Sequence, residues 1–164
     1  RKLREVVQDF CKYYRHHRKK KVIYYYDSTA LGSNYAVNDE DFKTVICDEF
    51  RKQGWDVKAV HIGNPMRHME KWLVISEGFT GKSGLIPMLN SNNNEELLLA
   101  MEQTGVYKGA EGFKKDKRGE KLAETEEDKL EYRTDGTDAF DTLYIGCTKF
   151  PQAASSIVIT SSFI

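Results

Sequence analysis

The chain has 164 residues, of which 40% are hydrophobic and 30% are charged. This length and composition are typical of one soluble globular domain with a real core. Lysine and arginine together number 25, as do aspartate and glutamate, so the chain lacks the overall positive charge that marks many nucleic-acid-binding proteins. No apolar run is long enough to cross a membrane, and the widely separated cysteines favour reduced thiols over a disulfide framework or a zinc site.

The first part of the chain predicts a β-α-β unit preceded by a helix. Its expected elements are a helix over 1–15, a strand over 22–26, a helix over 39–53 and a strand over 56–62. Asn38 or Asp39 is expected to cap the second helix, and Gly54 to end it. Because strands joined by a crossover helix lie parallel in one sheet, the two strands are expected to be neighbours.

The second part predicts further helices separated by polar segments. Its expected elements are a helix over 66–77, a short strand over 85–89, a helix from Asn94 to Gly105, a long loop or irregular hairpin over 106–134 and a helix over about 137–149. The last helix is expected to bury Ala139, Phe140, Leu143 and Tyr144.

Asp27 is the most informative single residue. It closes the β-rich run Val22-Ile23-Tyr24-Tyr25-Tyr26 and is followed by small, turn-forming residues. In open α/β sheets, ligands and metals collect at the carboxyl ends of the strands. An aspartate at such a position also serves as a turn or helix-capping residue, so both interpretations stand.

A second group of carboxylates lies near the end of the chain, at Asp135, Asp138 and Asp141. On a helix, Asp138 and Asp141 share a face, and Asp135 lies at or just before the first turn. Carboxylates brought together from a strand end and a helix start can hold Mg²⁺, which prefers oxygen ligands. The alternative is that Asp135 and Asp138 cap the helix and complement its dipole.

Two basic runs complete the chemically informative features. They are Lys12, Arg15, Arg18, Lys19, Lys20 and Lys21, and Lys114, Lys115, Lys117, Arg118 and Lys121. Such runs are usually solvated surface. Next to a carboxylate metal site they fit a phosphodiester substrate, whose backbone needs cations and whose hydrolysis needs an activated water.

Four segments taken in order resemble the carboxyl-terminal nuclease domain of the large terminase subunit of tailed phages. They are KVIYYYDSTALGS, GWDVKAVHIGNP, GFKKDKRGEK and TDGTDAFDTLYIG. The resemblance covers residues 1–150 and leaves 151–164 as a tail without a clear role. It implies an α/β, ribonuclease H-like fold with flanking helices and a two-metal endonuclease site holding Mg²⁺ or Mn²⁺. Members of the family cleave concatemeric double-stranded DNA.

Matched residue by residue, the resemblance makes Asp27 and Asp138 catalytic metal ligands, the middle and third carboxylates of the family's set. Asp135 competes with Asp138 for the third position, and Asp141 is expected behind the ligands or on the helix surface. The residues expected to contact DNA are Lys19, Lys20, Lys21, Lys114, Lys115, Lys117 and Arg118.

The chain departs from the family at its start, because the family's first metal-binding aspartate lies on a first strand that is not present here. We therefore expect a partial nuclease domain, weak or inactive when isolated. The Gly81-Lys82-Ser83 run does not supply an ATPase, because Ser76 stands where a phosphate-binding loop needs glycine. For the parent protein, the resemblance implies an upstream ATPase domain, a small terminase subunit and a portal as partners, no membrane, and the cytoplasm of an infected bacterium.

Two other functions remain as alternatives. One is a non-catalytic α/β module that binds DNA or a packaging partner. The other is a haloacid-dehalogenase-like phosphatase, although Thr29 stands where that family places its next acid. The nuclease hypothesis predicts that the carboxylates of Asp27 and Asp138 approach within about 8 Å, since two-metal sites hold ions roughly 4 Å apart. It also predicts that strand 22–26 has an exposed edge.

Overall fold

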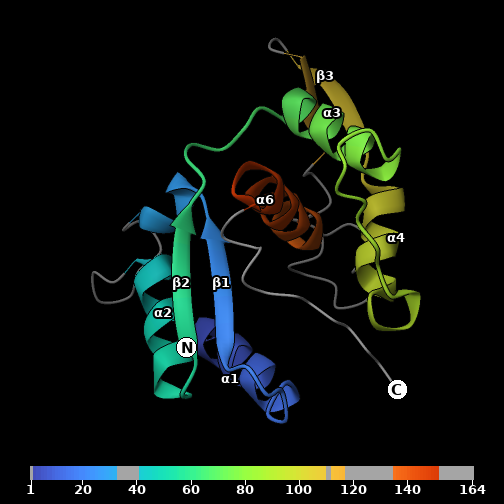
Figure 1. The fold of residues 1–164 in the computed structure, drawn as a ribbon. Helices are drawn as coiled ribbons and strands as arrows, with labels where there is room; N and C mark the ends of the chain where they lie inside the picture. Colours follow the sequence, from blue (N-terminus) through green and yellow to red (C-terminus); the bar gives the residue numbers. More distant parts are fainter. Residues whose placement is uncertain (1, 33–40, 110–111, 117–134, 152–164) are drawn as a thin grey trace. The chain divides into compact units, whose positions relative to one another are not determined.

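The computed structural model describes residues 2–32, 41–109, 112–116 and 135–151 (Figure 1). The fold is mixed α/β, with its strands in two small sheets. The described chain divides into two compact units, the first running to Pro65 together with 149–151, the second spanning Met66–Thr148. No helix among the described residues is both long and apolar enough for a membrane span.

The first unit contains the predicted helix-strand-helix-strand order. Its elements are α1 (Lys2–Tyr13), β1 (Lys21–Tyr26), the short 3₁₀ helix η1 (Ser28–Leu31), α2 (Phe42–Lys52) and β2 (Asp56–His61). β1 and β2 are adjacent and parallel, with Tyr26 opposite His61 at the carboxyl end, which confirms the predicted β-α-β unit. Within the described residues β1 pairs only with β2, so its other edge has no partner strand there.

The core of the first unit lies between its helices and one face of the strand pair. Its buried residues are Val7, Cys11, Phe50 and Trp55, with Phe10, Tyr14, Val22, Ile46 and Val57 packed against them. Val22 and Val57 are partners in the ladder and therefore present the same face. The ring of Phe10 meets those of Phe50 and Trp55 edge-on, at 5.4 and 5.6 Å between centroids. This packing confirms that α1 lies against a face of the unit.

The predicted cap of α2 was wrong. The capping residue is Asp41, whose carboxylate accepts a hydrogen bond from the backbone N–H of Thr44 at 2.6 Å. Hydrogen bonds from the hydroxyl and then from the backbone N–H of Thr44 hold the pKa of Asp41 below its usual value. Asn38 and Asp39 lie outside the described residues. Gly54 follows the helix with φ of +78°, a conformation that glycine adopts without strain, so the predicted stop is confirmed.

The second unit contains the elements α3 (His68–Phe79), the short 3₁₀ helix η3 (Ser91–Asn93), α4 (Glu95–Gln103), β3 (Val106–Gly109), β4 (Gly112–Lys115) and α6 (Asp135–Lys149). β3 and β4 form an antiparallel hairpin, which confirms that part of the predicted irregular hairpin; 117–134 lies outside the described residues. Asn94 precedes α4 as expected, but its side chain donates to the carbonyl of Asn90 and does not cap the helix.

The predicted strand over 85–89 is not formed. Ile86 and Met88 are 59% and 92% exposed, and Pro87 has no N–H to give to a ladder. The carbonyl of Leu85 accepts from the hydroxyl of Tyr144 at 2.9 Å, so this segment is bonded to α6 and, within the described ranges, pairs with no strand.

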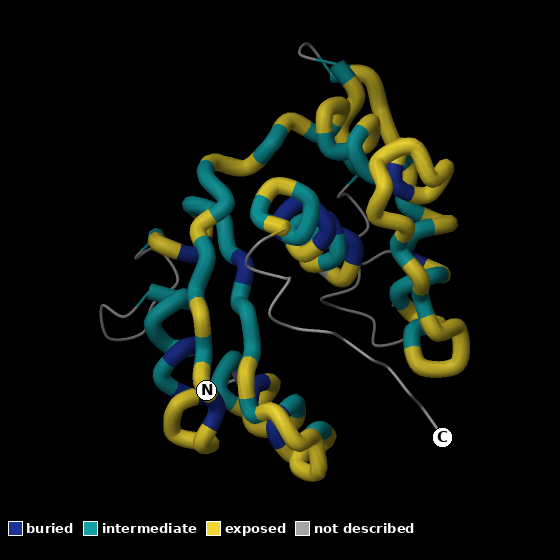
Figure 2. Tube along the Cα trace, viewed as in Figure 1, coloured by how far each residue is buried: buried dark blue, intermediate teal, exposed yellow. Residues whose placement is uncertain are grey.

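The buried stripe of α6 differs from the predicted one. It consists of Thr137, Asp141, Tyr144 and Ile145, at helical spacing, whereas Leu143 is 51% exposed (Figure 2). Ala139 is exposed as well. Tyr144 fixes this stripe against α3, because a side chain at Gly78 would lie 2.0 Å from its hydroxyl. Of the predicted buried residues, Tyr144 is buried and Phe140 is half-buried, so apolar periodicity placed the helix face correctly only in part.

Candidate functional site

The carboxyl edge of the β1–β2 pair carries Asp27, as predicted. Asp27 directly follows β1 and caps η1, with its carboxylate accepting from the backbone N–H of Thr29 at 2.9 Å and from the Thr29 hydroxyl. Both interpretations of this residue therefore meet at one place: it lies at the ligand-binding edge of a parallel pair, and it stabilises its own turn.

A polar cluster that sequence reasoning missed lies at the same edge. The hydroxyl of Ser28 donates to the side-chain carbonyl of Asn64 at 2.8 Å and lies 3.2 Å from Nε2 of His61. Which of the two atoms donates in the second contact depends on the tautomer of His61. The signal that could have found this cluster is the parallel register, which puts residues following β1 beside those following β2.

An aromatic row leads along the sheet to this cluster. Tyr24 and Tyr26 stack at 5.6 Å between ring centroids, and Tyr26 and His61 stack at 5.2 Å. Burial, reinforced by Cys47 and Asp27, raises the pKa of Tyr24 to about 12, so this phenol stays protonated at neutral pH. The row fixes the ring of His61 from one side while Ser28 holds it by a hydrogen bond.

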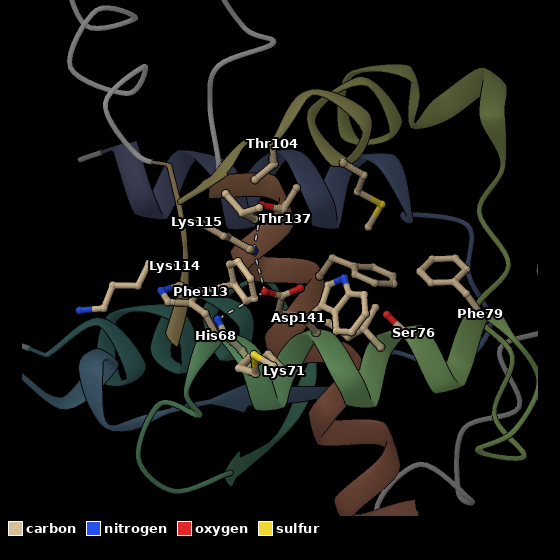
Figure 3. A pocket seen from close by; sticks show the side chains of 16 residues that line it. His68, Lys71, Ser76, Phe79, Thr104, Phe113, Lys114, Lys115, Thr137 and Asp141 are labelled. Carbon is tan, nitrogen blue, oxygen red and sulfur yellow. Dashed lines mark hydrogen bonds and ion pairs between the residues drawn. The ribbon is translucent and has the colours of Figure 1, made fainter. Parts of the chain in front are cut away.

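The carboxylates of α6 belong to a four-charge cluster in the second unit, which we call the lysine–aspartate cluster. It comprises Lys71 of α3, Lys115 of β4, and Asp138 and Asp141 of α6. The Nζ of Lys115 lies 2.9 Å from Asp138 and 2.7 Å from Asp141, and the Nζ of Lys71 lies 3.8 and 3.3 Å from the same two carboxylates. Figure 3 shows Lys115 and Lys71 directed toward Asp141. The prediction that Asp138 and Asp141 share a helix face is confirmed.

Lys115 is fully occupied in this cluster. Its ammonium group has three donors, and the acceptors Thr137, Asp138 and Asp141 take one each. Lys115 therefore does not have the solvated side chain expected of a DNA-contacting lysine. Lys71 makes ion-pair contacts but no hydrogen bond among the described residues, so its donors are not saturated.

Of the two positions expected for Asp141, the helix surface was wrong, and a position behind the metal ligands stays a prediction. The side chain of Asp141 is 8% exposed and is compensated by both lysines. An isolated carboxylate would pay a large desolvation penalty at such a place, which two ammonium groups offset. Asp138 lies in the first turn of α6, as predicted, and is 32% exposed. Asp135 begins the helix, and its side chain is not described, so the choice between Asp135 and Asp138 stays open.

The carboxylates of this chain meet only some of the requirements of a site for a divalent ion. Aspartate oxygens are suitable ligands for Mg²⁺. Within the described residues, however, no group of three or more histidine, cysteine, aspartate or glutamate side chains is arranged to hold a metal. Asp138 and Asp141 already face ammonium groups, which a metal would have to displace. Asp27 and Asp138 lie in different units, so their approach to within about 8 Å stays a prediction.

The remaining basic residues have unlike surroundings. Lys19 and Lys114 are exposed, while Lys21 pairs with Asp56 at 3.3 Å. The Nζ of Lys20 donates to the carbonyls of Tyr14 and Arg15 and lies 4.9 Å from the Trp55 ring centroid. Lys20 therefore has a structural role that the sequence did not indicate. Lys117, Arg118 and Lys121 lie outside the described residues.

A pocket of about 610 Å³ opens beside the lysine–aspartate cluster, wholly within the second unit (Figure 3). Its apolar wall includes Met69, Trp72, Phe79, Phe113 and Phe140, and its polar side includes Lys71, Lys115, Thr137 and Asp141. Sequence reasoning missed this pocket because its lining comes from α3, α4, the hairpin and α6. The helical spacing of Met69 and Trp72 was the only local signal.

Comparison with family models, curated proteins and solved structures finds no match for this chain.

Proposed function

We propose that this chain is the second part of a ribonuclease H-like, metal-dependent endonuclease domain, of the kind found in the large terminase subunits of tailed phages. The observation that carries the proposal is the position of Asp27, directly after β1 at the carboxyl edge of a parallel strand pair. This edge is where α/β folds collect ligands and metals. The proposed substrate is double-stranded DNA.

In this proposal, Asp27 and Asp138 hold the metal ions, with a further carboxylate supplied by the parent protein. Bound Mg²⁺ or Mn²⁺ would activate water and stabilise the leaving oxygen of the phosphodiester. Thr29 would orient the carboxylate of Asp27, whereas Lys115 would give up its contact with Asp138 to the ion. Exposed Lys19 and Lys114 would contact the DNA backbone.

A second candidate is a non-catalytic α/β module that docks DNA or a packaging protein. The lysine–aspartate cluster favours it, because Asp138 and Asp141 are already balanced by Lys71 and Lys115. A balanced carboxylate attracts a divalent ion less strongly than an unpaired one does. In this candidate the cluster joins α3, β4 and α6 and takes no part in chemistry.

Plasmid nicking by the parent protein, with Mg²⁺, Mn²⁺ or a chelator, tests the proposal. Asp27→Asn and Asp138→Asn should each reduce cleavage to background while DNA binding stays within about twofold, since a lost metal ligand removes no phosphate contact. Asp48→Asn is the matched control: it removes the same charge from an exposed acid that pairs only locally, with Arg51, and should leave cleavage unchanged.

The outcomes separate the two candidates. Full cleavage by Asp27→Asn, or cleavage that survives the chelator, would reject the metal-dependent mechanism. DNA binding without cleavage by the unmodified parent would favour the docking module. Cutting by the isolated 164-residue chain would show that the catalytic set is complete without an upstream carboxylate.

A further inference from the structure

The pocket in the second unit combines an apolar wall with one incompletely bonded cation. Five large apolar residues of the wall are strongly exposed, a concentration that marks a binding surface more often than chance exposure. They are Met69 at 42%, Trp72 at 62%, Phe79 at 49%, Val106 at 64% and Phe113 at 50%. A volume of about 610 Å³ lies within the range of small-molecule sites, which bind through apolar walls and a few fixed polar groups.

The polar side of the pocket holds two lysines with different bonding. Lys115 has no spare donor, because Thr137, Asp138 and Asp141 take all three. Lys71, 16% exposed, lines the same pocket and makes ion pairs at 3.3 and 3.8 Å without a hydrogen bond among the described residues. It can therefore donate to a ligand without leaving the cluster.

The lysine–aspartate cluster is balanced without a ligand, because Lys71 and Lys115 face Asp138 and Asp141. Among the described residues of the cluster, Lys71 is the lysine with donors left for a ligand. One anionic group matches that single contact, whereas a second negative charge would lie against the carboxylate of Asp141.

We propose that this pocket binds a ligand with a flat apolar body and one anionic group, the body against Trp72 and Phe140 and the anion on Lys71. The proposal uses no residue of the carboxyl edge that carries Asp27, and it does not depend on nuclease activity. Two kinds of ligand have this chemistry. One is a free aromatic anion, and the other is a nucleotide whose base enters the pocket with its singly charged phosphodiester.

The probe is the fluorescent aromatic sulfonate 1-anilinonaphthalene-8-sulfonate, with uncharged N-phenyl-1-naphthylamine as its matched analogue. The folded 164-residue chain should bind one sulfonate. Lys71→Gln should weaken the sulfonate about tenfold, as expected for a charge-assisted hydrogen bond, and leave the uncharged analogue within about twofold. Lys71→Arg, which keeps charge and donors, should retain sulfonate binding.

Two further variants distinguish the loss of a ligand contact from the loss of the fold. Trp72→Ala changes an exposed side chain, so the fold should persist, and both probes should weaken about tenfold through lost stacking. Lys114→Gln removes an exposed charge beside Lys115 and should change binding only about twofold. Near-ultraviolet circular dichroism checks that each variant is folded.

The source of the anion is decided by competition. Displacement of the sulfonate by a short thymidine oligonucleotide would assign the site to a nucleotide, and failure to displace it would assign the site to free aromatic anions. Sulfonate binding that is equal in Lys71→Gln and the parent chain, or insensitive to Trp72→Ala, would overturn the proposal. So would binding of many probe molecules to each chain.

Discussion

Asp27 and Asp138 each lie at the start of a helical segment. The hydrogen-bond partners of their carboxylates, however, come from different parts of the fold. Among the described residues, the carboxylate of Asp27 bonds to a neighbour two residues away, through the backbone and hydroxyl of Thr29. Asp138 and Asp141 bond to lysines from two other elements, at 2.9 and 2.7 Å for Lys115. The first carboxylate is held by its own turn, and the other two are held by the tertiary fold.

The carboxylate of Asp27 is therefore available to a ligand, whereas the carboxylates of Asp138 and Asp141 are committed to ion pairs with lysines. Asp27 can exchange a turn hydrogen bond for a ligand at modest cost, since a capping interaction is worth about 1 kcal/mol. Asp141, 8% exposed, cannot lose its lysines without leaving a charge buried. An acidic residue in a promising sequence motif is therefore a candidate ligand only after its partners in the fold are known.

The largest effect is expected in the cluster. Lys115→Met should lower the free energy of unfolding by on the order of 3 kcal/mol, because Asp141 loses its closest partner. Urea denaturation of the 164-residue chain measures this. Lys114→Met is the matched control, since its side chain is exposed and the same charge is removed one residue away, and it should stay within about 0.5 kcal/mol. Equal effects of the two variants would show that the cluster contributes nothing specific.

A smaller effect is expected at the edge. Asp27→Ala should cost about 1 kcal/mol through loss of the cap on η1, whereas Asp27→Asn, which keeps an acceptor for Thr29, should cost only a few tenths. The same Asn variant removes the charge that a divalent ion needs. Urea denaturation and Mn²⁺ titration of both variants in the parent protein would separate the two roles. Unchanged Mn²⁺ affinity in a stable Asp27→Asn protein would leave Asp27 as a cap alone.

The basic run before β1 offers the same contrast between available and committed side chains. Lys19 is exposed, whereas Lys20 donates to two carbonyls and lies over Trp55. In the parent protein, Lys19→Gln should reduce the slope of log affinity for DNA against log salt by about 0.9, the value for one phosphate contact. Lys20→Gln should lower stability and leave that slope unchanged. The reverse pattern would show that the run binds DNA through Lys20.

Glu49 of α2 is expected to give the smallest effect. It is a buried acid that accepts hydrogen bonds from two amides and lies 3.7 Å from the guanidinium of Arg4. Its side chain accepts from Gln8 at 2.8 Å and Gln53 at 3.1 Å, and these bonds lower its pKa below the usual value. A lowered pKa stabilises the fold above the unfolded-state pKa and loses that contribution as pH falls through the folded value. Glu49→Gln should therefore be less stable than the parent chain at pH 7, and the difference should shrink in acid. A constant difference across this pH range would contradict the assignment.

Local patterns were sufficient where one short segment decides the structure. The strand run and its turn residues placed Asp27 at the end of β1, and helical spacing placed α1 and α2. The parallel pairing followed from chain order, because a crossover helix leaves few other arrangements. The capping residue of α2 was misplaced by two or three residues, since several Asn and Asp side chains near the helix start are chemically equivalent caps.

Only the tertiary structure decided which charges meet. Lys71, Lys115 and Asp141 are far apart in sequence, and no local pattern distinguishes a lysine that faces solvent from one that neutralises a buried acid. The buried stripe of α6 includes Thr137 and Asp141 because partners from other elements compensate them, so apolar periodicity selected Leu143 incorrectly. Sequence alone thus determined most of the elements and the place of Asp27, but not the segment 85–89. Long-range electrostatic pairing, which depends on distances between elements, determined the environment of Asp138 and Asp141.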